Sequence, residues 1–503
     1  MNSRGREHNR KHTVLLPPLA RRFLVKPWTP SVPLYPHFDA KIPPAEAERI
    51  VKDPQLVATH KFFPFLKYDE RWTMFAQKGS RGKSKQRPIR FAARLDSCIF
   101  SYYRHQLSEP YEQQLKAADL GTSIIAYRRI PKADGKGGQS NIDFALSAFE
   151  AVQRLGNCCA VALDISSFFE NLDHAQLQSV WAGLIGQTRL PPDHYKVFQA
   201  ITRYAFADVK KVYERLGYFG DKEDRHGKVR KGYLRSRQQI PTQLCTGKTF
   251  REKIAGEGPL ASIIEVNKTD KGVPQGAPLS DLLANAYLLK FDKFVQELCT
   301  GFGGTYYRYS DDILIVAPIS ASDALGLEAD IRKVISTHGG GLIIKEEKSA
   351  VHQFHTDGAR QRVTVVKATD KDGKPAWSKP FEYLGFRYDG RSAFIRDKTM
   401  SNLHRKIASI CRATAIRLTK RYQGKCTDEI MDMADFERLF QSFGSVQDFH
   451  EKSDDYRSWT FTTYAKRAAK TMGPLGTPIG AQLKGLRRAI EDRLRKELSR
   501  VGA

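Results

Sequence analysis

Two adjacent carboxylates, Asp311 and Asp312, lie between two strand-like runs of the sequence. Residues 303–308 and 313–316 are rich in aromatic and β-branched side chains, so we expect a β-hairpin with both acids at its tip. Adjacent like charges repel and therefore favour a bound cation. Carboxylate oxygens suit Mg²⁺, and two such ions can activate a hydroxyl and stabilise a leaving phosphate. A lone pair of this kind is more often a surface turn, so the interpretation depends on further residues.

A third carboxylate, Asp164, directly follows an apolar run at residues 159–163. Such a run predicts a strand that is buried on both faces. The Ser-containing turn at residues 165–169 would leave the acid at the strand end, well placed to hold a metal ion. The chain therefore supplies the third ligand that a surface turn would not need.

Two further segments could bind a nucleotide. Basic residues are dense from residue 78 to 94, where glycines predict a loop that runs into a strand at 88–91. Arginine forks onto phosphate oxygens, so this segment could close over a triphosphate. The Gly- and Pro-rich stretch 272–280 precedes an apolar helix, and its glycines would let the backbone approach a ligand. Taken alone, the second segment is better explained as an ordinary loop before a core helix.

The 503-residue chain carries a net charge of +27, which favours a polyanionic partner such as nucleic acid over a neutral small molecule. Basic residues with interleaved aromatics concentrate at about 205–255 and predict a loop that contacts RNA, although a charged surface insertion has the same composition. The 7 cysteines include no CxxC pair, which argues against a zinc ribbon and for a reducing compartment.

Neither an apolar run of about 18 residues nor a secretory signal is found, so we expect a cytoplasmic protein without membrane contact. A Pro-rich basic arm is expected at residues 1 to about 45. Hydrophobic periodicity predicts the other elements. Helices are expected at 98–115, 141–155, 321–337 and in several segments after about 395. Strands are expected at 342–348, in a hairpin around Asp372-Gly373, and at 381–386.

The chain thus shows, in order, a basic segment, an acid after a strand, a Pro-Gln-Gly loop, an Asp-Asp hairpin, a Lys-bearing segment and a Leu-Gly strand. Over about residues 80–390 this set and order resemble the reverse transcriptases. The resemblance implies an α/β (α+β) fold shaped as a right hand, with fingers and palm around a mixed or antiparallel sheet and a helical thumb and C-terminal region. The implied divisions are an N-terminal arm and lead-in at 1–75, fingers at 76–163, a palm at 164–390 with a basic insertion at about 185–265, and a thumb at 391–503.

The resemblance also implies roles for individual residues. Asp164 and Asp311 would bind two Mg²⁺ ions, with Asp312 and the Ile165 carbonyl assisting, and Mn²⁺ suits the same ligands. Lys348 would give a proton to the leaving pyrophosphate.

The resemblance further assigns the nucleotide contacts. Phe169 falls where these enzymes place an aromatic gate against a 2′-hydroxyl, so the product should be DNA. Gln275 would contact the incoming nucleotide. Arg87 would grip the triphosphate of that nucleotide, helped by Lys83 or Lys85.

Contacts to the primer and template follow in the same way. Tyr383, Leu384 and Gly385 look like the primer grip, and Tyr309 would pack beneath the primer end. Further nucleic-acid contacts are expected from six basic residues: Arg128, Arg230, Lys231, Arg235, Arg405 and Arg412.

Residues 89–96, 126–128, 164–174 and 383–390 are similar to the bacterial defence-associated reverse transcriptases of the unknown-group and abortive-infection types. This implies RNA-directed DNA synthesis from dNTPs in antiphage defence, with a dedicated non-coding RNA as template or scaffold. Homo-oligomers and priming on a protein hydroxyl occur among some relatives. The Asn-Ala-x-x-His and Val-Thr-Gly motifs usual in retron enzymes are not found.

Three alternatives stay open. A group II intron reverse transcriptase and maturase shares the Pro-Gln-Gly loop, but its usual Ser-Pro is Ser280-Asp281 here, and the cysteine spacing of its frequent zinc-bearing endonuclease is missing. A non-catalytic RNA-binding scaffold would have no need of all three acids. An RNA-dependent RNA polymerase is disfavoured by Phe169.

Overall fold

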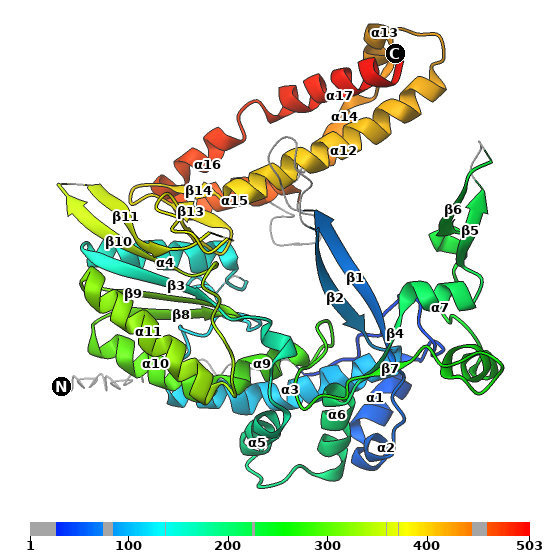
Figure 1. The fold of residues 1–503 in the computed structure, drawn as a ribbon, viewed down its shortest axis with the longest axis horizontal. Helices are drawn as coiled ribbons and strands as arrows, with labels where there is room; N and C mark the ends of the chain where they lie inside the picture. The colour runs from blue at the N-terminus through cyan, green and yellow to red at the C-terminus, as the bar shows by residue number, and fades with distance from the viewer. Residues whose placement is uncertain are drawn as a thin grey trace, which may run out of the picture.

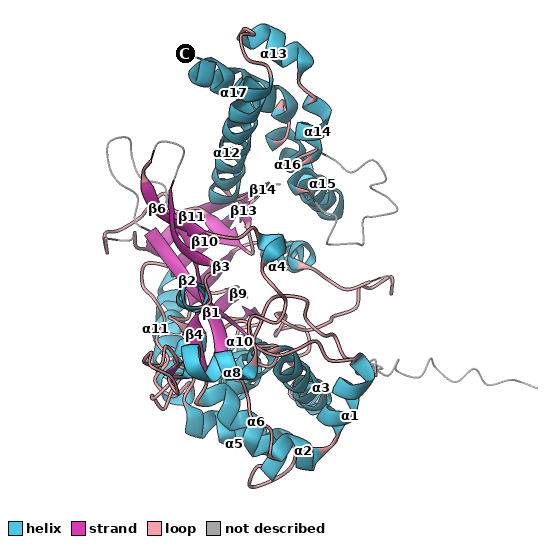
Figure 2. Cartoon of the chain, turned by 90° about the vertical axis from the view of Figure 1, so that its right-hand side faces the viewer, coloured by secondary structure: helices cyan, strands magenta, loops and turns pink. Residues whose placement is uncertain are grey.

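The computed structural model describes residues 27–73, 84–135, 137–223, 227–358, 360–370, 372–444 and 460–502. These residues form a mixed α/β fold with two main sheets and a pair of long helices that extends away from them (Figures 1 and 2). The fold class expected from the sequence is confirmed. None of the described helices is long and apolar enough to cross a membrane.

The central sheet has the strand order β11-β10-β3-β9-β8, with every neighbouring pair antiparallel. Its strands are β3 (Cys158–Asp164), β8 (Thr305–Tyr309), β9 (Asp312–Ala317), β10 (Ala350–Asp357) and β11 (Arg360–Ala368). Successive side chains of β3 enter different cores, because neighbouring residues of a strand point to opposite faces. Helix α4 (Asn141–Leu155) covers one face, and α10 (Leu289–Gly301) and α11 (Ala321–His338) cover the other (Figure 1).

The second sheet has the order β2-β1-β4-β7. Its strands are β1 (Phe65–Thr73), β2 (Ser84–Phe91), β4 (Ala205–Asp208) and β7 (Glu265–Val266). Since β4 pairs in parallel with β1, part of the stretch expected to be a basic insertion shares a sheet with β1 and β2. Helix α3 (Arg94–Ala117) follows β2 and packs much of its length in the main core.

The prediction that residues 205–255 form a basic loop is wrong, because much of this stretch forms helices and strands. Lys210 and Lys211 lie on α7 (Val209–Arg215), and Arg230 and Lys231 lie on β6. Strands β5 (Phe219–Glu223) and β6 (Val229–Tyr233) form a separate, mostly exposed hairpin (Figure 1).

The long helices are α12 (Asp397–Arg421) and α17 (Leu486–Gly502), which pack along each other. The apolar face expected on the last helix is buried there at Leu486, Ile490, Leu494 and Leu498. Among the described residues, the remaining helices of four residues or more are α1 (Pro44–Lys52), α2 (Pro54–Ala58), α5 (His174–Leu184), α6 (Pro192–Thr202), α8 (Gly247–Phe250), α9 (Ser280–Tyr287), α13 (Thr427–Met433), α14 (Phe436–Gln441), α15 (Phe461–Met472) and α16 (Thr477–Gln482), with a π-helical turn at Arg251–Ala255 and a 3-10 turn at Gly473–Gly476.

Two expected strand features are not formed in the structure. Residues 342–348 form no strand, and Ile344 makes only an isolated bridge to Ile165. The hairpin expected around Asp372-Gly373 is only a tight turn, because β11 pairs instead with β10.

The expected strand at 381–386 is interrupted. Leu384 and Gly385 have φ values of 45° and 95° and form the turn between β12 (Phe381–Tyr383) and β13 (Phe386–Tyr388). Strand β13 pairs in turn with β14 (Ala393–Ile395). Apolar composition favours a strand here, but it does not reveal a positive φ.

The described part of the N-terminal arm lies against the body of its own chain. The indole of Trp28 donates to Ser101, and the Tyr35 hydroxyl donates to the Ala92 carbonyl. Residues 1–26 of this arm lie outside the described residues, as does the glycine-containing loop at 74–83 with Lys83.

Candidate active site

The three predicted acids lie together at one edge of the central sheet. Asp164 pairs with Asp312 across β3 and β9, and the Ile165 backbone N–H donates to the Asp311 carbonyl at 2.9 Å. The expected hairpin of β8 and β9 is confirmed, with Tyr309 opposite Asp312. A central strand and its neighbour therefore bring together acids that are about 150 positions apart in the sequence.

A buried ion pair holds the hairpin turn. The Arg308 guanidinium lies 2.6 Å from the Asp292 carboxylate of α10, and both side chains are fully buried. The Tyr306 hydroxyl also donates to Asp292, at 2.7 Å. Arg308 then donates to the Ser310 carbonyl at 3.2 Å, while Ser310 has a φ of 60°. The turn that carries the two acids is therefore fixed from beneath.

Lys348 neutralises the most buried acid. Its ammonium lies 2.6 Å from both carboxylate oxygens of Asp164. Burial raises the pKa of Asp164, and the Lys348 ammonium opposes that rise. Desolvation, together with the Asp311 and Asp164 carboxylates, raises the pKa of Asp312 to about 7, although water still reaches this side chain. Burial and the repulsion among the carboxylates therefore both favour neutralisation of the cluster by a proton or a cation.

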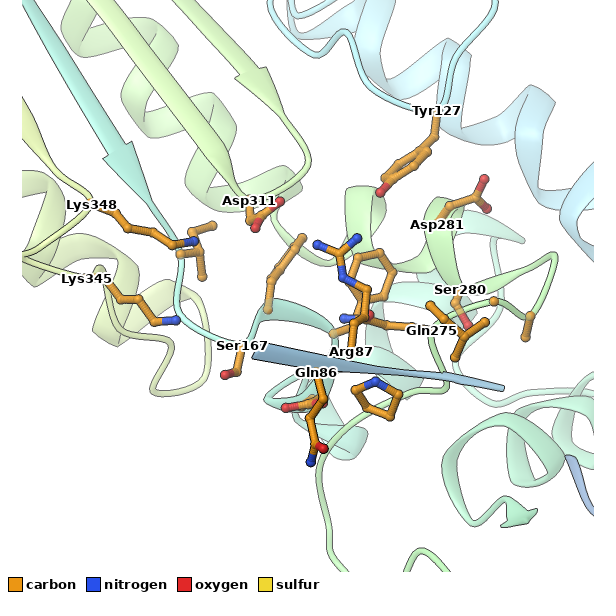
Figure 3. Close-up of a pocket in the computed structure, with 18 residues that line it drawn as sticks. Gln86, Arg87, Tyr127, Ser167, Gln275, Ser280, Asp281, Asp311, Lys345 and Lys348 are labelled. Atoms are coloured by element: carbon orange, nitrogen blue, oxygen red, sulfur yellow. The ribbon is translucent and has the colours of Figure 1, made fainter. Parts of the chain in front are cut away.

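A pocket of about 600 Å³ opens beside these acids (Figure 3). Arg87 on β2, Phe169 after β3, Gln275 of the Pro-Gln-Gly loop, Asp311 and Lys348 all line it. In Figure 3 the Arg87 side chain points into the pocket on the side of Asp311. The structure thus brings together the residues predicted to contact a nucleotide, apart from Lys83 and the side chain of Lys85, which lie outside the described part of the chain.

The Pro-Gln-Gly loop is docked on two neighbours. The Arg90 N–H donates to the Gln275 carbonyl at 2.8 Å, and the Val273 N–H donates to the Phe169 carbonyl at 2.8 Å. Gly276 has a φ of 107°, and a Cβ there would lie 2.6 Å from the Arg90 carbonyl oxygen. Only glycine permits this close approach, so the loop joins β2 to the Phe169 segment.

The predicted primer grip lies on the other side of the acids. Asp164, Asp311 and Asp312 line a second pocket of about 580 Å³ together with Tyr383 and Leu384. A third pocket, of about 670 Å³, is lined in part by Tyr309, Leu384 and Gly385. Sequence reasoning missed Arg396, which lines both of these pockets, because no motif marks it.

Arg128, one of the predicted nucleic-acid contacts, is bonded within the fold. The Arg128 guanidinium is buried, donates to both oxygens of Glu112 at 2.7 and 2.6 Å, and also donates to the Gly121 and Ile124 carbonyls. Four of its five N–H donors are therefore used within the chain.

The other predicted basic contacts lie away from the acids. Arg230 and Lys231 are exposed on β6, where Lys231 lies 3.3 Å from Asp221. Arg235 stacks over the Tyr218 ring.

The last two predicted contacts are on α12. Arg405 contacts Asn402, and Arg412 lies 3.4 Å from Glu497 while its side chain stays 64% exposed. Both remain predictions as nucleic-acid contacts.

Tyr127 and Asp281 were not predicted as site residues, yet both line the first pocket. Asp281 could have been found, because it replaces the proline usual at that position in the group II intron relatives. Tyr127 could not have been found from the sequence, because its place in the pocket depends on a backbone φ of 59°, which no sequence pattern here reveals.

The residues fit a divalent metal ion in type and position, but they do not enclose one. Among the described residues, no group of three or more His, Cys, Asp or Glu side chains converges closely enough to hold a metal ion. The three carboxylates still offer hard oxygen donors on adjoining strands, and their mutual repulsion favours a cation. An ion bound there would complete its shell with water or nucleotide oxygens.

Comparison with known proteins identifies part of the chain. Residues 249–388 match the family model "Reverse transcriptase (RNA-dependent DNA polymerase)". The retron Mx162 reverse transcriptase of Myxococcus xanthus is 31% identical over 166 residues, which is 30% of this chain and 32% of that relative. The retron Mx65 reverse transcriptase of the same organism is 33% identical over 108 residues, 21% of this chain and 23% of the relative. This similarity was not expected from the sequence, because the two motifs usual in retron enzymes are not found in the chain.

Two solved structures are similar at low scores. Apo telomerase from Candida tropicalis is 12% identical, with a TM-score of 0.33 over 88% of this chain and 68% of that chain. Telomerase from Candida albicans, in complex with a TWJ fragment of telomeric RNA, is also 12% identical, with a TM-score of 0.33 over 92% and 66%. On the sequence matches, residues 249–388 are similar to the reverse transcriptase family, and the chain is distantly similar to bacterial retron reverse transcriptases over about a third of their length.

Proposed function

We propose that this protein is an RNA-directed DNA polymerase that adds deoxynucleotides to a primer end. The observation that carries the proposal is the pairing of Asp164 with Asp312 across β3 and β9, with Asp311 beside them at the mouth of the first pocket. The family match begins at residue 249, so Asp164 lies outside it. The contribution of Asp164 is therefore inferred from its position in the fold.

Each of the pocket residues would have a separate role in the reaction. Asp164, Asp311 and Asp312 would hold divalent metal ions, which in this chemistry lower the pKa of the attacking hydroxyl and neutralise the leaving phosphates. Lys348 would protonate the leaving pyrophosphate. The Arg87 guanidinium would orient the triphosphate oxygens.

Two residues would select the nucleotide. The Gln275 backbone carbonyl is already bonded to Arg90, so its side chain is the group left to contact the nucleotide. The Phe169 ring, half-buried at the pocket wall, would exclude a 2′-hydroxyl.

The larger divisions serve this reaction in the proposal. Residues 76–163 would act as fingers and residues 164–390 as the palm. The pair α12 and α17 would act as a thumb over the product duplex. Tyr383 to Gly385 would hold the primer beside the acids, with Tyr309 beneath its end.

We also infer a bacterial antiphage role with a dedicated non-coding RNA. The support is the similarity of residues 164–174 and 383–390 to the defence-associated enzymes, and the net charge of +27. The distant similarity to retron reverse transcriptases is compatible with a bacterial enzyme. Sequencing RNA and cDNA that co-purify with the protein tests this part, and a single enriched RNA with matching cDNA is expected. Recovery of flanking intron RNA would favour the maturase alternative.

The polymerase assignment is tested by primer extension. Purified protein is given a DNA primer on an RNA template, Mg²⁺ and either the four dNTPs or the four NTPs. We expect template-directed extension with dNTPs that EDTA abolishes. Extension with NTPs but not with dNTPs would replace this proposal with an RNA polymerase.

A further inference from the structure

We propose that Tyr127 determines sugar selection by bracing the Phe169 ring, and that the Arg104–Asp281 ion pair holds Tyr127 in this position. This inference rests on the proposed function, because it concerns how the same pocket discriminates deoxynucleotides from ribonucleotides. The resemblance to known enzymes assigned a role to Phe169 but none to Tyr127, Arg104 or Asp281.

Tyr127 is held in an unusual conformation at the pocket wall. Its φ of 59° lies in the left-handed region, which side chains other than glycine seldom adopt. The residue is 41% exposed although it is large and aromatic. In Figure 3 the ring extends from its loop into the pocket. A strained residue that presents an aromatic ring to a pocket is a reason to look for a function there.

The Tyr127 ring lies between two aromatic residues of the proposed site. Its centroid is 6.5 Å from that of Phe169, edge to face at 76°. Its centroid is 6.4 Å from that of Tyr309, which precedes the hairpin acids. A ring at this place limits how far Phe169 can turn away from a bound sugar.

The strained loop is anchored at three successive residues. The Arg104 guanidinium on α3 donates to the Tyr127 carbonyl at 3.0 Å. The Asn285 amide on α9 donates to the Ala126 carbonyl at 2.8 Å, and Glu112 accepts from Arg128 as described above. Strain of this kind persists only where the surroundings over-determine the backbone, and here α3 and α9 supply that restraint.

Asp281 is the connection between this loop and the pocket. Its two carboxylate oxygens accept from Arg104 at 2.9 and 3.0 Å, in the bidentate arrangement that fixes a guanidinium plane. Asp281 also lines the pocket itself, at the first turn of α9. Replacing its carboxylate would loosen Arg104, and through Arg104 the Tyr127 backbone.

The test measures the ratio of kcat/KM for a dNTP to kcat/KM for the matching NTP. Phe169→Ala removes the gate itself and should lower this ratio by about 100-fold, near the upper range for an apolar pocket contact. Tyr127→Ala should lower it by about tenfold and Asp281→Asn by a smaller factor, while Tyr127→Phe, which keeps the ring, should preserve it. Far-UV circular dichroism establishes that each variant is folded.

Glu46→Gln is the matched control. Arg49 donates to both oxygens of Glu46 on α1, so this variant also removes a bidentate pair, but one that lies outside the pocket. Its ratio should equal that of the wild type. A wild-type ratio in Tyr127→Ala, with Phe169→Ala altered, would overturn the brace and leave the polymerase assignment intact. A wild-type protein that extends no primer with either nucleotide would overturn the polymerase assignment and the brace with it.

Discussion

The Lys348 ammonium lies 2.6 Å from each carboxylate oxygen of Asp164, at the end of the central strand of the sheet. Lys348 lies in the turn before β10, and Asp164 is the last residue of β3. The pairing of β10 with β3 brings these two residues together. The side chain of Lys348 is 42% exposed, whereas that of Asp164 is 10% exposed. The lysine, which already lines the pocket, can therefore leave the acid and turn toward a bound nucleotide without opening the core.

Lys348→Met removes the proposed proton donor. We expect kcat for dNTP incorporation to fall about 100-fold, a typical loss for a general acid, with little change in KM. Lys345→Met is the matched control, since Lys345 lines the same pocket but its backbone, not its side chain, contacts Asp164. Single-turnover kinetics measure the effect. Equal losses in the two variants would contradict a specific role for Lys348.

Asp312 predicts a pH dependence of stability. Its pKa in the folded chain is about 7 against an ordinary value of 3.8, so the folded state binds more protons than the unfolded state between these values. The free energy of unfolding should therefore fall as pH rises through this window. Thermal denaturation at several pH values in EDTA measures the slope, which Asp312→Asn should reduce. Mg²⁺ should restore stability mainly above pH 7, where the carboxylate is free of its proton. The same slope in wild type and Asp312→Asn would contradict the assignment.

Local sequence patterns predicted the elements that carry the site more reliably than the way the elements pair. The buried strand before Asp164 and the hairpin before Asp312 were predicted correctly, because apolar runs and alternation are local signals. The pairing of β3 with β9 was not predicted. Pairing is a long-range property, and no spacing in the chain expresses it.

The failures have physical causes of the same kind. The turn at Leu384-Gly385 depends on positive φ values that an apolar Tyr-Leu-Gly-Phe sequence does not reveal. Arg128 was predicted to contact nucleic acid, but its guanidinium is paired within the fold with Glu112 on α3. Charge alone does not distinguish an exposed arginine from a buried structural one.

The β5–β6 hairpin predicts a separable RNA contact. Arg230→Ala, Lys231→Ala and Arg235→Ala together should weaken RNA binding and reduce the slope of log affinity against log salt by about 2 to 3, near one unit for each lost phosphate contact. Filter binding at several salt concentrations measures this slope. The control combines Arg49→Ala with Lys52→Ala, two cations that are ion-paired on α1. A slope that changes equally in both proteins would indicate a nonspecific charge effect.

The buried pair beneath the hairpin predicts a large loss of stability. Asp292→Asn leaves the Arg308 guanidinium buried without its counter-charge and should lower the free energy of unfolding by about 3 to 5 kcal/mol. Asp221→Asn breaks the exposed pair with Lys231 and should cost about 0 to 1 kcal/mol. Urea denaturation measures both, and similar small losses would show that Arg308 does not need its partner.

The most direct test of the central claim uses Asp311→Asn combined with Asp312→Asn. These substitutions keep the size of each side chain and remove the charge that would hold a divalent ion. Incorporation of dNTPs on an RNA template should fall below detection, while circular dichroism and the thermal midpoint show a folded protein. Incorporation at the wild-type rate by this folded double variant would contradict the proposal that the hairpin acids form the catalytic centre.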